Sequence, residues 1–257
     1  MAAELTIESA IRFALTIGML SYSSYKDIKT REISDLVWII FGIAGLVLNI
    51  YELYNGTLGL LTLLIALGFS LGLSIVTGYL GLFGGADLLA IVVIGLLNPI
   101  TPTLNLRIPL TPSVIFPLTV LSNSALIGAS GIIIVFFYNM IHVRDETIFQ
   151  GYEPISIWWR IVIFFTGLNK KIDNIRGPPF DYPLEKVGES NTISLLIMPN
   201  FSDDNGALET IQKLRSMNRE RLWVSYSLPF LLILGIGYIS ATLFGDFILS
   251  IVIWFIH

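Results

Sequence analysis

The sequence predicts an all-α polytopic membrane protein of about six transmembrane helices, with a small α+β cytoplasmic insert between spans 5 and 6. Hydrophobic residues make up 54% of the 257 residues and charged residues only 13%, whereas soluble domains carry about 25% charged residues. The mean hydropathy is +0.77. Apolar runs long enough to cross a bilayer recur along the chain, and one long polar stretch interrupts them.

Six apolar segments are expected to cross the membrane, since about 20 residues at about 1.5 Å each are needed for one span. The first segment follows the acidic residues Glu4 and Glu8, so we expect a true span and no cleavable secretory signal. The spans are expected at residues 7–25, 36–51, 58–80, about 80–97, 113–141 and from 222 onward.

The last apolar segment allows two interpretations. Residues 223–256 are apolar for longer than one helix needs, and Gly245 and Asp246 interrupt them. The segment is either one long helix or a helix to about Leu243 followed by a short terminal piece. Asp246 most simply marks the outer interface, which favours six spans with a final interfacial or frayed turn over seven.

Basic residues predict the orientation of the spans, because cytoplasmic loops are enriched in Lys and Arg. Lys26, Lys29 and Arg31 fill the first loop, many more basic residues follow the fifth span, and the opposite side holds little beyond Arg107. We therefore expect the first, third and fifth loops in the cytoplasm and both termini outside, in the cell membrane.

Three regions follow from this pattern: transmembrane helices 1–5 in residues 1–141, a cytoplasmic soluble insert in 142–221, and a C-terminal transmembrane helix in 222–257. Within the insert, residues 192–198 predict a strand, 207–217 an amphipathic helix, 205–206 a turn, and 177–179 and 181–183 loops. Residues 155–168 contain two tryptophans and are expected at the membrane surface.

Composition narrows the possible chemistry. The chain has no cysteine, which excludes disulfides, CxxC zinc sites and thiol nucleophiles. The chain has two histidines, which argues against a histidine-rich metal site and against a Ser/His/Asp triad. We therefore expect no metal and no cofactor. The net charge of −4 and the lack of a basic, aromatic patch argue against a nucleic-acid partner.

Two carboxylates stand out by position. Asp87 follows Gly84, Gly85 and Ala86, and the fourth span must reach back through these residues, which places Asp87 about 10 Å inside the cytoplasmic boundary. A charge in the middle of a membrane costs about 2.5–3.5 kcal/mol, so such residues usually serve a function. The three small residues would let a substrate strand or a neighbouring helix approach the backbone.

Asp27 lies at the cytoplasmic end of the first span, so the two aspartates can meet. Two carboxylates that share a site do not both ionise readily. The charged one would activate water as a general base, and the protonated one would polarise a peptide carbonyl. Simpler interpretations remain: Asp27 as an ordinary interfacial residue, and Asp87 as a helix-start residue favoured by the dipole.

The pattern Asp27…Ile33-Ser34-Asp35, with Gly84-Gly85-Ala86-Asp87 opening the fourth span, resembles the GxGD aspartic membrane proteases. Span number and loop charges look most like the archaeal preflagellin and prepilin peptidases, or class III signal peptidases. The resemblance implies that Asp27 and Asp87 are catalytic and that flagellin- or pilin-like precursors are cleaved after a short basic leader. Ala86 departs from the GxGD pattern. Nothing in the sequence matches the amino-terminal cytoplasmic domain of the bacterial relatives, so we expect peptidase activity without methyltransferase activity.

Two other functions remain open from the residues alone. Intramembrane carboxylates also relay ions in proton- or cation-coupled transporters, although no repeated halves are visible here. A non-enzymatic membrane scaffold would leave Asp87 unexplained. Elsewhere, Arg12 is expected to snorkel or to pair with Glu8, and Asp35 to cap the second span.

Overall fold

The computed structural model describes residues 6–81, 83–102, 113–142, 149, 151–188, 192–201 and 203–256. By their internal contacts the residues divide into two compact units. Unit 1 comprises residues 1–128 and 229–257, and unit 2 comprises residues 129–228. Helix α5, Phe116–His142, contributes residues to both units.

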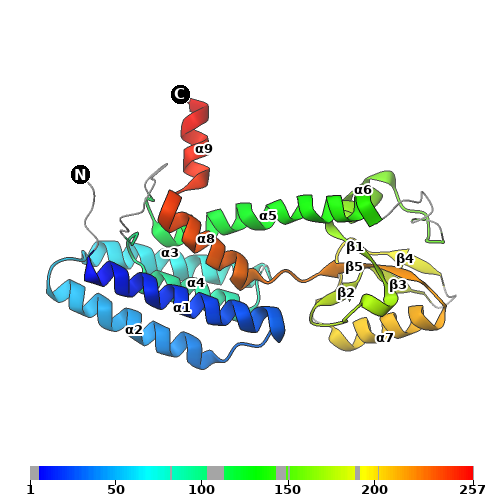
Figure 1. Ribbon diagram of the computed structural model, residues 1–257, viewed down its shortest axis with the longest axis horizontal. Coiled ribbons are helices and arrows are strands. Elements are labelled where there is room, and N and C mark those ends of the chain that lie inside the picture. Colours follow the sequence, from blue (N-terminus) through cyan, green and yellow to red (C-terminus); the bar gives the residue numbers. More distant parts are fainter. Residues whose placement is uncertain are drawn as a thin grey trace. The chain divides into compact units, whose positions relative to one another are not determined.

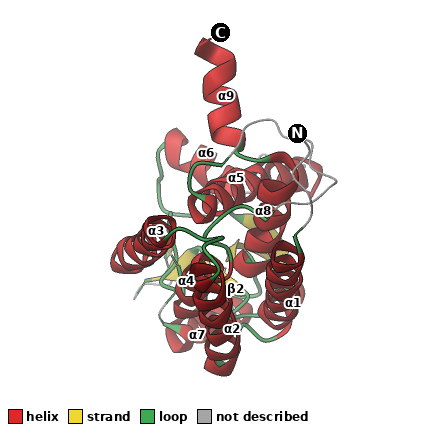
Figure 2. Cartoon of the chain, turned by 90° about the vertical axis from the view of Figure 1, so that its left-hand side faces the viewer, coloured by secondary structure: helices red, strands yellow, loops and turns green. Residues whose placement is uncertain are grey.

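Unit 1 is helical, and α1 to α4 lie side by side in it (Figures 1 and 2). Its core draws buried side chains from α1, α2, α4, α5 and α8, among them Met19, Trp38, Ile94, Phe116 and Tyr238. The helices besides α5 are α1 (Ile7–Lys29), α2 (Asp35–Tyr54), α3 (Leu60–Tyr79), α4 (Gly85–Leu97), α8 (Phe230–Phe244) and α9 (Phe247–Ile256).

Small residues let α3 and α4 pack closely. A side chain at Gly95 of α4 would collide with Ser70 of α3, so glycine is required there. About two helical turns closer to the start of α4, the Ser74 hydroxyl donates to the Leu88 carbonyl at 3.0 Å. These contacts fix α4 against α3 along its length.

Among the described helices, α2, α3 and α5 are each long and apolar enough to cross a membrane. This supports a membrane protein but accounts for three of the six expected spans. Helix α4 has 13 residues and α8 has 15, which corresponds to about 20 Å and 23 Å. The fourth helix begins at Gly85, so the expectation that it reaches back to about residue 80 is wrong.

The last apolar segment is two helices, which decides between the two interpretations of it. Gly245 breaks the segment with a φ of 84°, a conformation that glycine adopts without strain. The Asn123 amide donates to the Gly245 carbonyl at 2.9 Å, and its oxygen accepts from the Phe247 N–H at 3.1 Å. Asp246 accepts from the Leu249 N–H at 2.9 Å and so caps α9.

Unit 2 contains a three-stranded antiparallel sheet in the order β1-β5-β2 and a hairpin of β3 and β4. Leu222 and Val224 of β5 pack with Leu214 of α7, and Trp223 packs with Ile163 of α6. Alternate residues of a strand face opposite sides, so α6 and α7 cover opposite faces of β5. The elements are α6 (Ile157–Thr166), β1 (Leu168–Lys171), η2 (Ile172–Asn174), β2 (Asp181–Pro183), β3 (Glu185–Val187), β4 (Ile193–Leu195), α7 (Asp204–Ser216) and β5 (Arg221–Tyr226).

The local predictions for the insert are correct in part. The predicted strand at 192–198 is present as β4, and the predicted helix at 207–217 is α7. The predicted turn at 205–206 is wrong, because both residues lie in the first turn of α7. The predicted loop at 181–183 is wrong too, because these residues pair with β5.

Two corrections concern helix starts. The last helix was expected from residue 222, but residues 222–226 belong to β5 and α8 begins at Phe230. The pairing of β5 with both β1 and β2 takes these apolar residues into the sheet. In α2 the cap is Ser34, whose hydroxyl accepts from the Leu36 N–H at 3.4 Å, and Asp35 is the first helical residue.

Candidate active site

Asp27 joins the end of α1 to the start of α8. It lies in the last turn of α1, and the residue as a whole is 8% exposed. Its Oδ2 accepts from the backbone N–H of Leu231 at 3.2 Å. Leu231 is the second residue of α8, and the first N–H groups of a helix have no partner within the helix. The carboxylate therefore satisfies a backbone group that would otherwise be buried without a partner.

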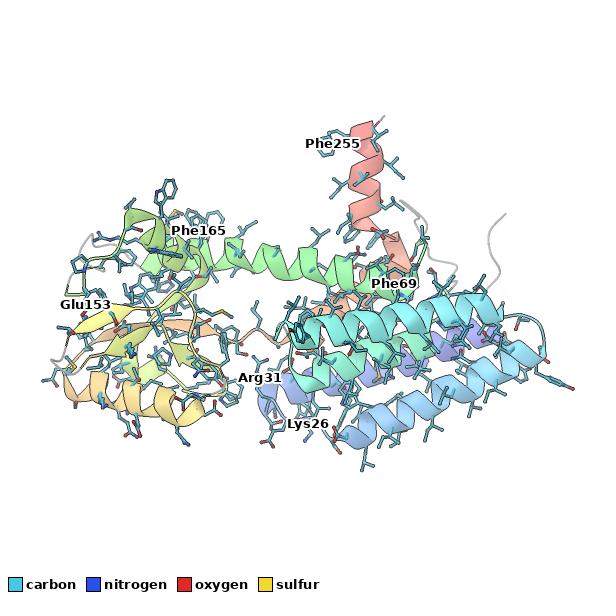
Figure 3. The ribbon with its side chains drawn as sticks, turned by 180° about the vertical axis from the view of Figure 1, so that it is seen from behind. Lys26, Arg31, Phe69, Glu153, Phe165 and Phe255 are labelled. Atoms are coloured by element: carbon cyan, nitrogen blue, oxygen red, sulfur yellow. The ribbon has the colours of Figure 1, made fainter. Side chains whose placement is uncertain are left out.

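Arg31 supplies the second contact of Asp27. Its Nη1 lies 2.9 Å from Asp27 Oδ1, and both side chains are 11% exposed. Arg31 follows α1 and has a φ of 58°, which is uncommon for a non-glycine residue. Figure 3 shows Lys26 and Arg31 at the same end of α1. A cation with this geometry stabilises the ionised carboxylate.

Asp87 is the third residue of α4 and is half-buried. Its Oδ2 accepts from the Gly84 N–H at 3.1 Å, so the side chain caps the start of its own helix. This contact fits the simpler interpretation of Asp87 as a helix-start residue, which the dipole also favours. It does not exclude a chemical role, because a carboxylate oxygen can accept more than one hydrogen bond.

The structure brings Asp27 and Asp87 to the same end of unit 1. The two carboxylates act on one another electrostatically, and the Arg31 cation also acts on Asp87. The aromatic rings of Phe83, just before α4, and Phe230, at the start of α8, are 4.2 Å apart. The start of α8 is thus in contact with the segments that carry both aspartates.

The three small residues before Asp87 differ in their surroundings. Gly84 and Gly85 are exposed, and a Cβ at Gly85 would meet no atom of the described residues within 4 Å. A Cβ at Gly84 would meet Asp87 Oδ2 at 3.6 Å. Ala86 is partly buried against the hydrophobic core. The open backbone beside Asp87 is therefore that of the two glycines.

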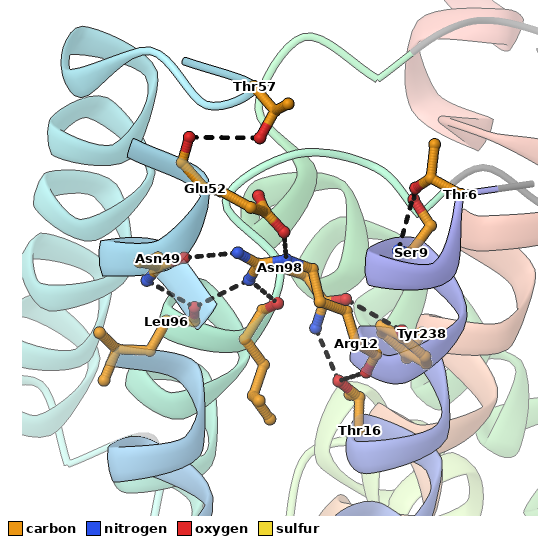
Figure 4. A network of polar contacts seen from close by, with 11 residues as sticks. Thr6, Ser9, Arg12, Thr16, Asn49, Glu52, Thr57, Leu96, Asn98 and Tyr238 are labelled. Carbon is orange, nitrogen blue, oxygen red and sulfur yellow. Dashed lines mark hydrogen bonds and ion pairs between the residues drawn. The ribbon is translucent and has the colours of Figure 1, made fainter. Parts of the chain in front are cut away.

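A buried arginine holds the opposite end of α4 (Figure 4). Arg12 is 2% exposed. Its guanidinium donates to Glu52 Oε1 at 2.9 Å, to Asn49 Oδ1 at 2.8 Å and to the Leu97 carbonyl at 2.5 Å. The expectation that Arg12 snorkels or pairs with Glu8 is wrong, because α2 and the end of α4 enclose its side chain.

Asn98 and Tyr238 extend this network toward α8 (Figure 4). The Asn98 amide donates to Thr16 Oγ1 at 2.7 Å, and the Tyr238 hydroxyl donates to Asn98 Oδ1 at 3.1 Å. The last carbonyls of a helix lack partners within the helix, and here Arg12 and Asn49 provide them. This cluster was not predicted from the sequence, although its polar residues lie inside apolar segments and could have indicated it.

Comparison with known proteins gives two matches that together cover most of the chain. Residues 14–143 match the type IV leader peptidase family, and residues 159–247 match the archaeal peptidase A24 C-terminus type II family. Asp27 and Asp87 both fall within the first match. The second match includes most of α6, the sheet of unit 2 and α8.

Two archaeal proteins are similar over nearly their whole length. A preflagellin peptidase of Methanocaldococcus jannaschii is 26% identical over 249 residues, which cover 91% of this chain and 94% of the relative. A preflagellin peptidase of Methanococcus voltae is 25% identical over 251 residues, which cover 95% of this chain and 99% of the relative.

Proposed function

Because the chain belongs to the type IV leader peptidase family, whose members are aspartic proteases, we propose that Asp27 and Asp87 are its catalytic pair. We further propose that it cleaves class III signal peptides from archaeal flagellin- or type IV pilin-like precursors at the cytoplasmic face of the membrane. The observation that carries the proposal is the convergence of the two aspartates, 60 residues apart in sequence, at one end of unit 1, where the start of α8 contacts both Asp27 and the segment just before Asp87.

The contacts of the two aspartates suggest different roles. Asp27 has a cationic partner in Arg31 and a backbone donor in Leu231, and both stabilise a charged carboxylate. The described hydrogen bond of Asp87 is with one backbone N–H. Asp27 is therefore assigned as the general base that activates water, and Asp87 as the acid that polarises the scissile carbonyl and later protonates the leaving amine.

The glycines beside Asp87 provide room for an extended substrate. With no side chain at Gly84 or Gly85, a peptide can approach the backbone next to the carboxyl group. We assign Ala86 to the same substrate-approach segment as the two glycines. Its methyl group packs against the hydrophobic core. The proposed partners of the protein are the precursor and the surrounding lipid bilayer.

The orientation of the site follows from charge. Lys26, Lys29 and Arg31 lie at the end of unit 1 that carries Asp27, and basic residues are retained on the cytoplasmic side. The catalytic pair is therefore assigned to that face and both termini to the outside. In this arrangement α1, α4 and α8 complete six spans with α2, α3 and α5, and α9 is an additional short piece.

The test is cleavage of a precursor that carries a class III signal peptide by the purified full-length protein in lipid. Asp27→Asn and Asp87→Asn should each abolish removal of the leader while the protein stays folded. Asp35→Asn is the matched control, since Asp35 is an exposed carboxylate close to Asp27 in sequence, and it should cleave at the wild-type rate.

Two other outcomes would contradict the proposal. Normal cleavage by either of the first two variants would eliminate the proposed pair. If the wild type cleaves no precursor but supports an ion flux that depends on these aspartates, the transporter interpretation replaces the proposal.

A further inference from the structure

Helix α6 presents an apolar face that the described part of unit 2 leaves largely exposed, although Phe165 at its end also contacts α5. Ile157, Trp158, Ile161 and Phe165 are exposed, with Trp158 at 73%. At about 100° per residue these four side chains fall within an arc of about 100° on the helix. Ile163 points the other way and is buried against the sheet. Exposed apolar patches of this kind mark interaction sites.

The position of α6 is fixed by the end of a helix that can cross the membrane. Within unit 2, the Phe136 ring of α5 stacks on Phe165 at 4.9 Å, with 14° between the ring planes. The Asn139 amide donates to the carbonyls of Phe164 and Gly167 at 2.7 and 2.6 Å. Asn139 is three residues from the end of α5, about 5 Å along the helix axis. Helix α6 therefore lies at the level where α5 ends.

The apolar surface continues from α5 onto α6. Ile133, Ile134, Phe137 and Ile141 of α5 are all exposed, as expected for a span that faces lipid. Figure 1 shows α6 at the end of α5, and Figure 3 marks Phe165 there. A soluble partner would have to cover a surface that is continuous with the lipid-facing side of a span, whereas the bilayer covers both without further contacts.

The composition of α6 fits the boundary between headgroups and acyl chains. Trp158 and Trp159 are adjacent, and tryptophan is enriched at that boundary. The sole charged residue of the helix is Arg160, whose guanidinium lies 5.7 Å from the centre of the Phe149 ring. Ten residues reach about 15 Å, which is too short to span.

We propose that α6 lies in the membrane interface, with the face formed by Ile157, Trp158, Ile161 and Phe165 in contact with lipid. Residues 155–168 were expected at the membrane surface, and the proposal now assigns this location to one face of α6. All of the contacts that support it lie within unit 2, so it does not depend on the proposed catalytic pair.

Site-directed spin labelling tests this proposal on the full-length protein. The chain has no cysteine, so a single introduced cysteine is the sole labelling site. Trp158→Cys reports on α6, Ile133→Cys on a lipid-facing position of α5, and Glu209→Cys on an exposed position of α7. Each labelled protein is reconstituted into phosphatidylcholine and phosphatidylglycerol vesicles, and collisions with oxygen and with a water-soluble nickel complex are measured.

We expect the label at position 158 to collide more often with oxygen and less often with the nickel complex than the label at 209. Its depth in the bilayer should be smaller than that of the label at 133. Nickel contact equal to that at 209 would place the helix in water and overturn the proposal. Protection from both reagents would also overturn it, because the face would then be covered by protein, either a second copy or a partner. Circular dichroism of the three variants confirms that they are equally folded.

Discussion

Arg12 and Glu52 form an ion pair of 2.9 Å inside unit 1, although they are 40 residues apart in sequence. The same guanidinium donates to the carbonyl of Leu97 at the end of α4. Helix α1 also carries Asp27 and α4 also carries Asp87. The two helices that hold the aspartates at one end are therefore tied together at the other end (Figure 4).

Removal of one partner of this pair should destabilise the protein strongly. Arg12→Met leaves Glu52 buried without its cation, and a broken buried pair typically costs about 3–5 kcal/mol. Thermal unfolding in detergent measures the loss. Lys29→Met is the control, because Lys29 is an exposed cation on the same helix and should change the stability by about 0.5 kcal/mol or less.

The double variant Arg12→Met/Glu52→Met separates the ion pair from other effects of the substitutions. Because it leaves no uncompensated charge, it should lose less stability than the two single variants added together. Equal behaviour of Arg12→Met and Lys29→Met would show that the pair does not hold the unit together.

Arg31→Gln should lower kcat for precursor cleavage, because Asp27 loses the cation that orients it. A hydrogen bond to a charged group contributes about 1.5–3 kcal/mol, which corresponds to about tenfold to a hundredfold in rate if it is lost in the transition state. Arg31→Lys should retain part of the rate. Glu32→Gln changes an exposed neighbour and should have no effect. A fully active Arg31→Gln would remove Arg31 from the proposed site.

Gly85→Val should impair cleavage without unfolding the protein. Among the residues that the structure describes, a Cβ at Gly85 meets no atom within 4 Å, so the helix can accommodate the side chain. The side chain would then occupy the space proposed for the substrate. The expected result is a lower kcat/KM at an unchanged melting temperature. Gly68→Val makes the same change at an exposed, equally open glycine of α3 and should cleave normally; similar losses in both would point to a general helix effect.

The stability of unit 2 should depend on pH through Glu185. Its side chain is 1% exposed and accepts from the Tyr152 hydroxyl at 2.7 Å and the Trp223 N–H at 2.8 Å. Burial raises the pKa of Glu185 above its ordinary value of 4.5. The folded state then binds more protons than the unfolded state, so stability falls as the pH rises above the ordinary value.

Glu185→Gln should remove this dependence, because glutamine is neutral and its oxygen can keep both hydrogen bonds. Hydrogen exchange of β5 in the full-length protein, compared with the wild type at equal pH, should show protection in the variant that grows as the pH rises above 4.5, the ordinary pKa of the carboxyl group. Glu209→Gln, at an exposed position of α7, should match the wild type throughout. An advantage that does not grow with pH would rule out titration of Glu185 as the cause.

The strands of unit 2 show why local patterns were insufficient there. Residues 222–226 are mostly apolar and are followed closely by an apolar helix, so the sequence favoured one span. Their partners in the sheet, Leu168–Lys171 and Asp181–Pro183, are distant in sequence and carry polar residues and a proline. Strand pairing of this kind depends on partners far along the chain, which periodicity does not reveal.

By itself the sequence determined the membrane class, the position of α1, α2, α3 and α5 to within a few residues, and the two aspartates as candidates. Apolar length and small-residue motifs are local properties, so they can be read directly from the chain. The tertiary structure alone decided the break at Gly245, the start of α4 at Gly85 and the partners of Arg12. The break at Gly245 and the partners of Arg12 depend on hydrogen bonds between segments that only folding brings together.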